Sequence, residues 1–159
     1  MIRKRGAGGT ARLVESAWVE LASSGARPRD HCLDVVNDVL ETSRLTRNDA
    51  ERAVERLVTF ALSDENYPVR ESALHAACTA STYYELPYRV VEPLAAGVDG
   101  FEPLLLTYVL AILGCTHDQA ALPIVERFLH HHHPEVRREA ADAVTELSWH
   151  RESTQDKKA

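Results

Sequence analysis

The sequence has few of the residues that build common catalytic and metal centres. Its 159 residues include three cysteines, Cys32, Cys78 and Cys115, which lie far apart and form no CxxC pair. The seven glycines form no phosphate-binding loop, and no GxSxG motif occurs. These absences predict a non-enzymatic protein without a cofactor. The odd number of cysteines predicts reduced thiols and a cytoplasmic location.

Positive charge is also scarce. Lys and Arg number 18 against 24 Asp and Glu, which gives a formal net charge of -6. Nucleic acids and anionic membranes attract proteins that carry a basic surface, so the sequence predicts neither as a partner. An acidic chain instead favours another protein, of basic character, as its partner. Lysine occurs only at Lys4, Lys157 and Lys158, a bias that predicts a bacterial source with a GC-rich genome.

The sequence does contain an internal repeat of apolar residues. The segment 69–77 aligns with the segment 136–144, and a proline precedes each by one or two residues. Similar units start at Cys32 and Leu104. In every unit apolar or small residues recur at offsets of 4, 7 and 8, which places them on one stripe of an α-helix. The pattern predicts an all-α, right-handed solenoid of about four helical hairpins.

Capping residues mark the starts of further helices between these units. Asn48–Glu51 and Thr116–Gln119 each place a capping side chain three residues before Glu or Gln. Pro93 and Pro123 fall inside predicted helices and are expected to kink them. We predict a flexible tail at 1–9, a repeat domain at 10–149 and a second flexible tail at 150–159. The eight helices are predicted at 10–23, 30–42, 48–62, 68–80, 86–96, 101–113, 117–131 and 134–149.

The segment from Ala120 to Ala143, with its proline-containing first helix, short turn and Pro-Glu-Val-Arg start of the second helix, resembles a HEAT repeat. The resemblance covers most of residues 48–149. It implies a turn Asp that faces an Arg six positions later, and Asp64 with Arg70 has this spacing. His131 stands at the Asp position opposite Arg137, and Leu105 stands at the Arg position of the third unit. The resemblance implies a protein-binding scaffold, since HEAT arrays seldom catalyse reactions.

The four histidines His130–His133 are the first candidates for metal ligands. Neighbouring residues on a helix point about 100° apart, so two of the four at most converge on one ion, whereas zinc needs three or four ligands. We therefore predict a solvated turn without metal. Cys78 and Cys115 lie on or near apolar helices and are predicted to be buried, unreactive thiols.

The predicted sixth helix, residues 101–113, is apolar on nearly all sides but too short to span a bilayer. It belongs either to an ordinary core or to an apolar groove on the concave side, and the sequence leaves both open. In the groove hypothesis acidic residues border one end of the strip and arginines the other. The predicted partner-binding residues are Asp34, Asp38, Glu41, Leu74, Leu106, Leu110, Arg137 and Arg138.

The sequence thus predicts a non-catalytic protein-binding module, with an immunity- or antitoxin-like inhibitor of a basic protein as one form of it. Two alternatives stay open. One is an enzyme that resembles bilin lyases or DNA alkylation-repair glycosylases. The other is a structural subunit that associates with itself through the apolar helix.

Overall fold

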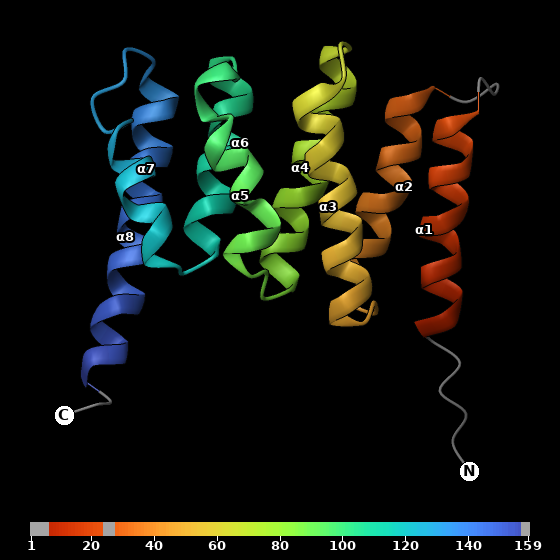
Figure 1. Ribbon diagram of the computed structural model, residues 1–159, viewed down its shortest axis with the longest axis horizontal. Coiled ribbons are helices and arrows are strands. Elements are labelled where there is room, and N and C mark those ends of the chain that lie inside the picture. Colours follow the sequence, from red (N-terminus) through yellow and green to blue (C-terminus); the bar gives the residue numbers. More distant parts are fainter. Residues whose placement is uncertain (1–6, 24–27, 157–159) are drawn as a thin grey trace. The chain divides into compact units, whose positions relative to one another are not determined.

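The computed structural model describes residues 7–23 and 28–156, and within these ranges it contains helices and no strand. The predicted all-α helical-repeat solenoid is confirmed (Figure 1). No helix in the described part of the chain is long and apolar enough to cross a membrane. The elements are α1 (Ala7–Ala22), α2 (Arg29–Glu41), α3 (Arg47–Ser63), α4 (Tyr67–Tyr83), α5 (Tyr88–Ala96), η1 (Val98–Gly100), α6 (Pro103–Cys115), η2 (Gln119–Ala121), α7 (Leu122–Glu126) and α8 (Pro134–Asp156).

The helices form two compact units, Met1–Tyr84 and Glu85–Ala159. In the N-terminal unit α4 packs against both α2 and α3, and α1 packs against α2. In the C-terminal unit α6 makes its most extensive contact with α8, and α5 and α7 add smaller contacts. Each unit buries the apolar stripes of its helices in its own core, as the repeat pattern predicts.

The repeat register is correct in three of the four units and wrong in the third. Cys32, Val69 and Val136 are buried, as predicted, but Leu104 is 51% exposed. The third unit starts instead at Leu105, which is fully buried. Its offsets of 4, 7 and 8 then fall on Val109, Ile112 and Leu113, which are also buried. Three consecutive leucines left no polar residue to fix the phase of this helix.

The cap of α3 lies two residues before the predicted one. The side chain of Thr46 accepts a hydrogen bond from the backbone N–H of Asp49 at 3.1 Å, and its hydroxyl donates to the Asp49 carboxylate at 2.8 Å. This pairing satisfies a free amide at the start of the helix. Glu51, predicted to be part of the cap, is instead buried and accepts a bond from Arg47 at 3.2 Å.

The seventh helix is much shorter than predicted. The segment predicted as one helix over 117–131 consists of η2, the five residues of α7, and a turn that follows. Pro123 lies in the first turn of α7, where a missing N–H costs nothing, so it does not kink a helix interior as predicted. Pro93 does lie inside α5. Conversely, α8 continues to Asp156, past the predicted end at 149.

An arginine at the second position of two repeat units connects its helix to the segment before it, which is the last turn of α3 for Arg70 and the histidine turn for Arg137. The guanidinium of Arg70 donates to the carbonyl of Ala61 at 3.1 Å. Arg137 donates in the same way to the carbonyls of His131 and His132, at 2.7 and 3.0 Å. These bonds satisfy carbonyls that have no partner within a helix. The Asp64 carboxylate, for its part, forms an ion pair with Arg29 at 2.6 Å.

Candidate functional site

The predicted acidic residues of α2 lie together on its exposed side. Asp34, Asp38 and Glu41 are all exposed, on the side opposite the buried stripe of α2. At the equivalent positions of the next repeat, α4 places Glu71, which is partly exposed, and His75, which is exposed. We call Asp34, Asp38, Glu41 and Glu71 the acidic face.

The two helices that carry the acidic face are held side by side. α2 packs against α4, and the hydroxyl of Thr79 donates to the side-chain oxygen of Asn37 at 2.7 Å. The single arginine of each helix, Arg29 in α2 and Arg70 in α4, lies in the first turn and is engaged with groups of the α3–α4 region. The acidic face therefore carries carboxylates of two helices without an arginine or lysine from either.

The three leucines predicted to bind a partner lie in the core. Leu74 and Leu110 are fully buried, and Leu106 is 3% exposed. Their burial favours the core hypothesis over the groove hypothesis, because a partner reaches only side chains that are exposed. A helix that is apolar on nearly all sides is covered here by helices of its own unit, α5, α7 and α8.

The two arginines predicted at the other end differ in their availability. Arg137 donates hydrogen bonds to the backbone carbonyls of His131 and His132 in the turn, so its role is structural. Arg138 pairs with Glu135 at 2.7 Å, and both side chains are largely exposed. Exposed pairs of this kind contribute little to stability, so Arg138 is free to exchange Glu135 for another anion.

A cavity between α1 and α3 was not predicted from the sequence. It has a volume of about 290 Å³, and its wall includes the buried side chains of Val14, Trp18 and Ala53. The guanidinium of Arg56 lies 4.8 Å from the ring of Trp18, which in turn stacks on Phe60 with a centroid distance of 6.0 Å. The contact between Arg56 and Trp18 is a cation–π interaction. The spacing of residues along one helix does not predict the contact between Arg56 and Trp18, because these residues lie on two different helices.

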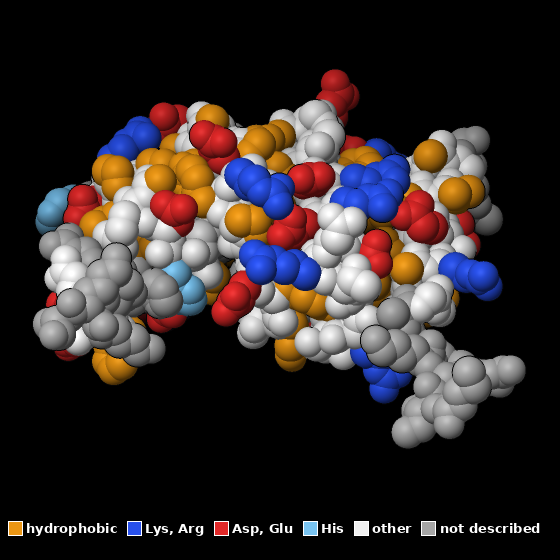
Figure 2. All heavy atoms as spheres, turned by 60° about the horizontal axis from the view of Figure 1, so that its bottom comes forward, with side chains coloured by type: hydrophobic (Ala, Val, Ile, Leu, Met, Phe, Trp, Pro, Cys, Tyr) orange, Lys and Arg blue, Asp and Glu red, His pale blue; other side chains and the backbone are white. Residues whose placement is uncertain are grey.

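The charges around this cavity have both signs. Its lining includes Glu15, Asp49 and Glu55 but also Arg52 and Arg56. Figure 2 likewise shows acidic and basic side chains interspersed on one face of the molecule. A mixed lining does not select one charge class of ligand, so the cavity is a weaker candidate than the acidic face.

The histidine turn is organised by hydrogen bonds and ring contacts. The Nδ1 atom of His131 accepts a bond from the backbone N–H of His133 at 3.1 Å. The His131 ring lies 4.2 Å from that of His132 and 6.0 Å from that of Phe128. Among the residues that the structure describes, no group of three or more His, Cys, Asp or Glu side chains is placed to hold a metal ion.

The surroundings of His131 in this turn predict a loss of stability in acid. Burial, then the neighbouring His132, His133 and Arg137, lower the pKa of His131 below 6.5. As the pH falls, His131 therefore becomes protonated in the unfolded chain before it does so in the folded chain. The free energy of unfolding decreases over the pH range between the ordinary pKa of histidine and the lowered pKa of folded His131. Protonation at Nδ1 also removes the acceptor for the His133 N–H.

Changing His131 to Gln is therefore expected to reduce the loss of stability that begins as the pH falls through 6.5, the ordinary pKa of histidine. Urea denaturation at a series of pH values measures it. The matched control is His130→Gln in the same turn, because His130 is exposed. An identical pH dependence in the wild type and in His131→Gln would contradict the prediction.

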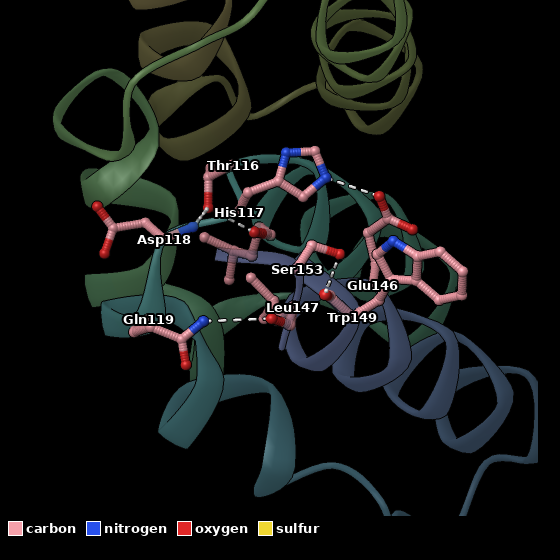
Figure 3. Close-up of polar contacts among 9 residues, drawn as sticks. Thr116, His117, Asp118, Gln119, Glu146, Leu147, Trp149 and Ser153 are labelled. Carbon is pink, nitrogen blue, oxygen red and sulfur yellow. Dashed lines mark hydrogen bonds and ion pairs between the residues drawn. The ribbon is translucent and has the colours of Figure 1, made fainter. Parts of the chain in front are cut away.

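The cluster that most resembles a catalytic centre lies between α6 and α8. Figure 3 shows His117 and Glu146 pointing toward one another, and His117 Nε2 lies 2.6 Å from Glu146 Oε1. Cys115 is nearby, but burial and then the carboxylates of Glu146 and Glu139 raise the pKa of its thiol. A raised pKa keeps the thiol protonated at neutral pH, which disfavours a nucleophilic role.

Comparison with known proteins finds structural neighbours and no sequence relatives. No protein-family model and no curated protein matches the chain. Two crystal structures described as an engineered protein, targets OR329 and OR497 of the Northeast Structural Genomics Consortium, match with TM-scores of 0.61 and 0.60. Both are 14% identical; the matches cover 90% and 89% of this chain but 64% and 38% of theirs. This chain therefore spans less than two thirds of either. The designed armadillo repeat protein YIII(Dq)4CqI matches with a TM-score of 0.47 and 11% identity over 88% of this chain and 82% of its own.

Proposed function

We propose that the protein is a HEAT-like, non-catalytic module that binds a basic surface of another protein through its acidic face. The observation that carries the proposal is the set of carboxylates on α2 and α4, to which neither helix adds an arginine or lysine. Helical-repeat proteins present stacked helices as extended binding surfaces. Asp34 and Glu71 each lie two residues after the first core residue of their unit, so these carboxylates occupy equivalent positions on neighbouring helices.

The charge of the acidic face determines the kind of partner. Exposed carboxylates on neighbouring helices attract arginine- and lysine-bearing surfaces and repel acidic ones, so they act on specificity and on the association rate. An immunity- or antitoxin-like inhibitor that covers a basic protein fits this description. The protonated thiol of Cys115 and the burial of the apolar α6 residues support binding by a charged surface rather than catalysis or apolar self-association.

Changing Asp34, Asp38 and Glu41 together to Lys is expected to abolish partner binding and leave the fold intact. All three side chains are exposed, so thermal stability should stay within about 1 kcal/mol of the wild type. The association rate with the captured and purified partner should fall, and this rate should no longer depend on the salt concentration. Capture from cell extract, followed by stopped-flow association kinetics at several salt concentrations, measures both effects.

The control for this experiment reverses three other exposed carboxylates, Glu65, Glu92 and Glu126, which lie outside α2 and α4. It changes the net charge by the same amount and should retain the partner. Equal binding by both triple variants would show that only net charge matters. Undiminished binding by the α2 variant would place the interface elsewhere.

A further inference from the structure

The cavity between α1 and α3 carries charged groups of opposite sign on its two walls. α1 contributes Glu15, and α3 contributes Arg52 and Arg56, which lie one helical turn apart on the same side of the helix. All three residues are exposed. Within the part of the chain that the structure describes, the side chains of Glu15 and Arg52 have no hydrogen bond or ion pair. The cavity therefore separates opposite charges that do not pair across it.

Arg56 is held in position by the aromatic part of the wall. Its guanidinium lies 4.8 Å from the centre of the Trp18 ring, and Trp18 stacks on Phe60. A guanidinium that is already stacked loses little further freedom when it binds a ligand, so its N–H groups are preorganised. Arg52 adds a second guanidinium one turn before it. Guanidinium groups bind carboxylates through two parallel hydrogen bonds, so this wall is suited to a carboxylate.

The remaining carboxylates of the wall restrict the charge of a ligand. Asp49 accepts a hydrogen bond from the hydroxyl of Thr46 at 2.8 Å, and Glu55 takes part in other polar interactions. The lining as a whole thus has three carboxylates and two guanidinium groups. These carboxylates repel a multiply charged anion, whereas a ligand with one carboxylate and one positive group satisfies both walls. The cavity volume of about 290 Å³ lies at the lower end of the range for ligand pockets and suits a small molecule.

We propose that this cavity binds a small zwitterion of about the size of a dipeptide. The carboxylate of the ligand is bound by Arg52 and Arg56, and its ammonium group is bound by Glu15. A short peptide with free ends has this chemistry, because it carries both charges and places aliphatic side chains between them. The cavity lies between α1 and α3, whereas the acidic face lies on α2 and α4. The proposal therefore does not depend on the proposed function.

The test is an NMR titration of the full chain with the dipeptide Leu-Leu and with two forms of it that each lack one charge. The N-acetylated form lacks the ammonium group, and the C-terminal amide lacks the carboxylate. Leu-Leu should shift the resonance of the Trp18 indole N–H. It should leave in place that of Trp149, which is 72% exposed and does not line the cavity. Each blocked form should bind about fivefold more weakly than Leu-Leu, because each loses one charge pair.

Matched variants assign each charge of the ligand to one wall. Arg52→Gln should weaken binding of Leu-Leu about fivefold and leave binding of the C-terminal amide unchanged, because the amide has no carboxylate to lose. Glu15→Gln should weaken binding of Leu-Leu and leave binding of the N-acetylated form unchanged. Arg44→Gln is the control, since Arg44 is exposed and does not line the cavity, and it should bind Leu-Leu normally.

Three results would overturn the proposal. The first is a Trp18 resonance that Leu-Leu does not shift, and the second is equal affinity for Leu-Leu and both blocked forms. The third is a measurable coupling between Glu15→Gln and Arg52→Gln in urea denaturation, because it would show that the two side chains pair with each other in the free protein. The variant with Asp34, Asp38 and Glu41 changed to Lys should bind Leu-Leu like the wild type, so a failure of the acidic face is distinguishable from a failure of this site.

Discussion

Replacing Leu105 by Asp is expected to unfold the C-terminal unit, whereas the same change at Leu104 is expected to leave it folded. The two leucines are adjacent in the first turn of α6, so a new carboxylate interacts similarly with the helix N-terminus at either position. They differ in burial, which is complete for Leu105, whereas Leu104 is 51% exposed. An unpaired carboxylate in an apolar core costs several kcal/mol, comparable to the whole stability of a small domain.

Far-UV circular dichroism and thermal unfolding of the two variants measure this difference. Leu104→Asp should retain the helical spectrum and a melting temperature near that of the wild type, because exposed substitutions change stability little. Leu105→Asp should lose helical signal at 25 °C or melt far lower. The reverse order would show that the repeat unit starts at Leu104, as its alignment with the other units first indicates.

This pair of residues also shows how far the sequence determines the fold. Apolar spacing identifies six of the helices within three residues at each end, and it also finds the start of α8, because core residues recur at helical intervals. It fails where polar residues are missing, as in Leu104–Leu106, where every phase is equally apolar. It also fails in the segment predicted over 117–131, where a capping signal and apolar residues suggested a long helix. Pro123 fits the first turn of a helix as well as a kinked interior, and the sequence does not distinguish these cases.

The candidate surfaces were predictable to different degrees. The exposure of Asp34, Asp38 and Glu41 follows from their position opposite the apolar stripe of α2. The stacking of Arg56 on Trp18 was not predictable, because it depends on how α1 and α3 pack. The exposure of Trp149 had a signal that the prediction missed. The core residues of α8 recur at 136, 140, 143 and 147, and residue 149 does not continue this stripe.

Replacing Gly114 by Val is expected to destabilise the C-terminal unit by more than about 2 kcal/mol. Gly114 is buried near the end of α6, where this helix makes its most extensive contact with α8. A Cβ atom at Gly114 would lie 3.0 Å from both Cα and Cβ of Ala143. Since Cα belongs to the backbone, rotation of a side chain cannot relieve this contact, and α8 must move away from α6.

Smaller changes at the same contact separate close packing from helix propensity. Gly114→Ala adds about 1 kcal/mol of helix propensity, yet it should still lower stability because its Cβ meets Ala143. Gly100→Ala is the control, since nothing lies within 4 Å of a Cβ at that position. Combining Gly114→Ala with Ala143→Gly removes the contact between the two Cβ atoms, and a double-mutant cycle should show a favourable coupling between the changes. Urea denaturation of the four variants gives these free energies. If Gly114→Val and Gly114→Ala were both as stable as the wild type, α6 and α8 would not approach as closely as Gly114 and Ala143 place them.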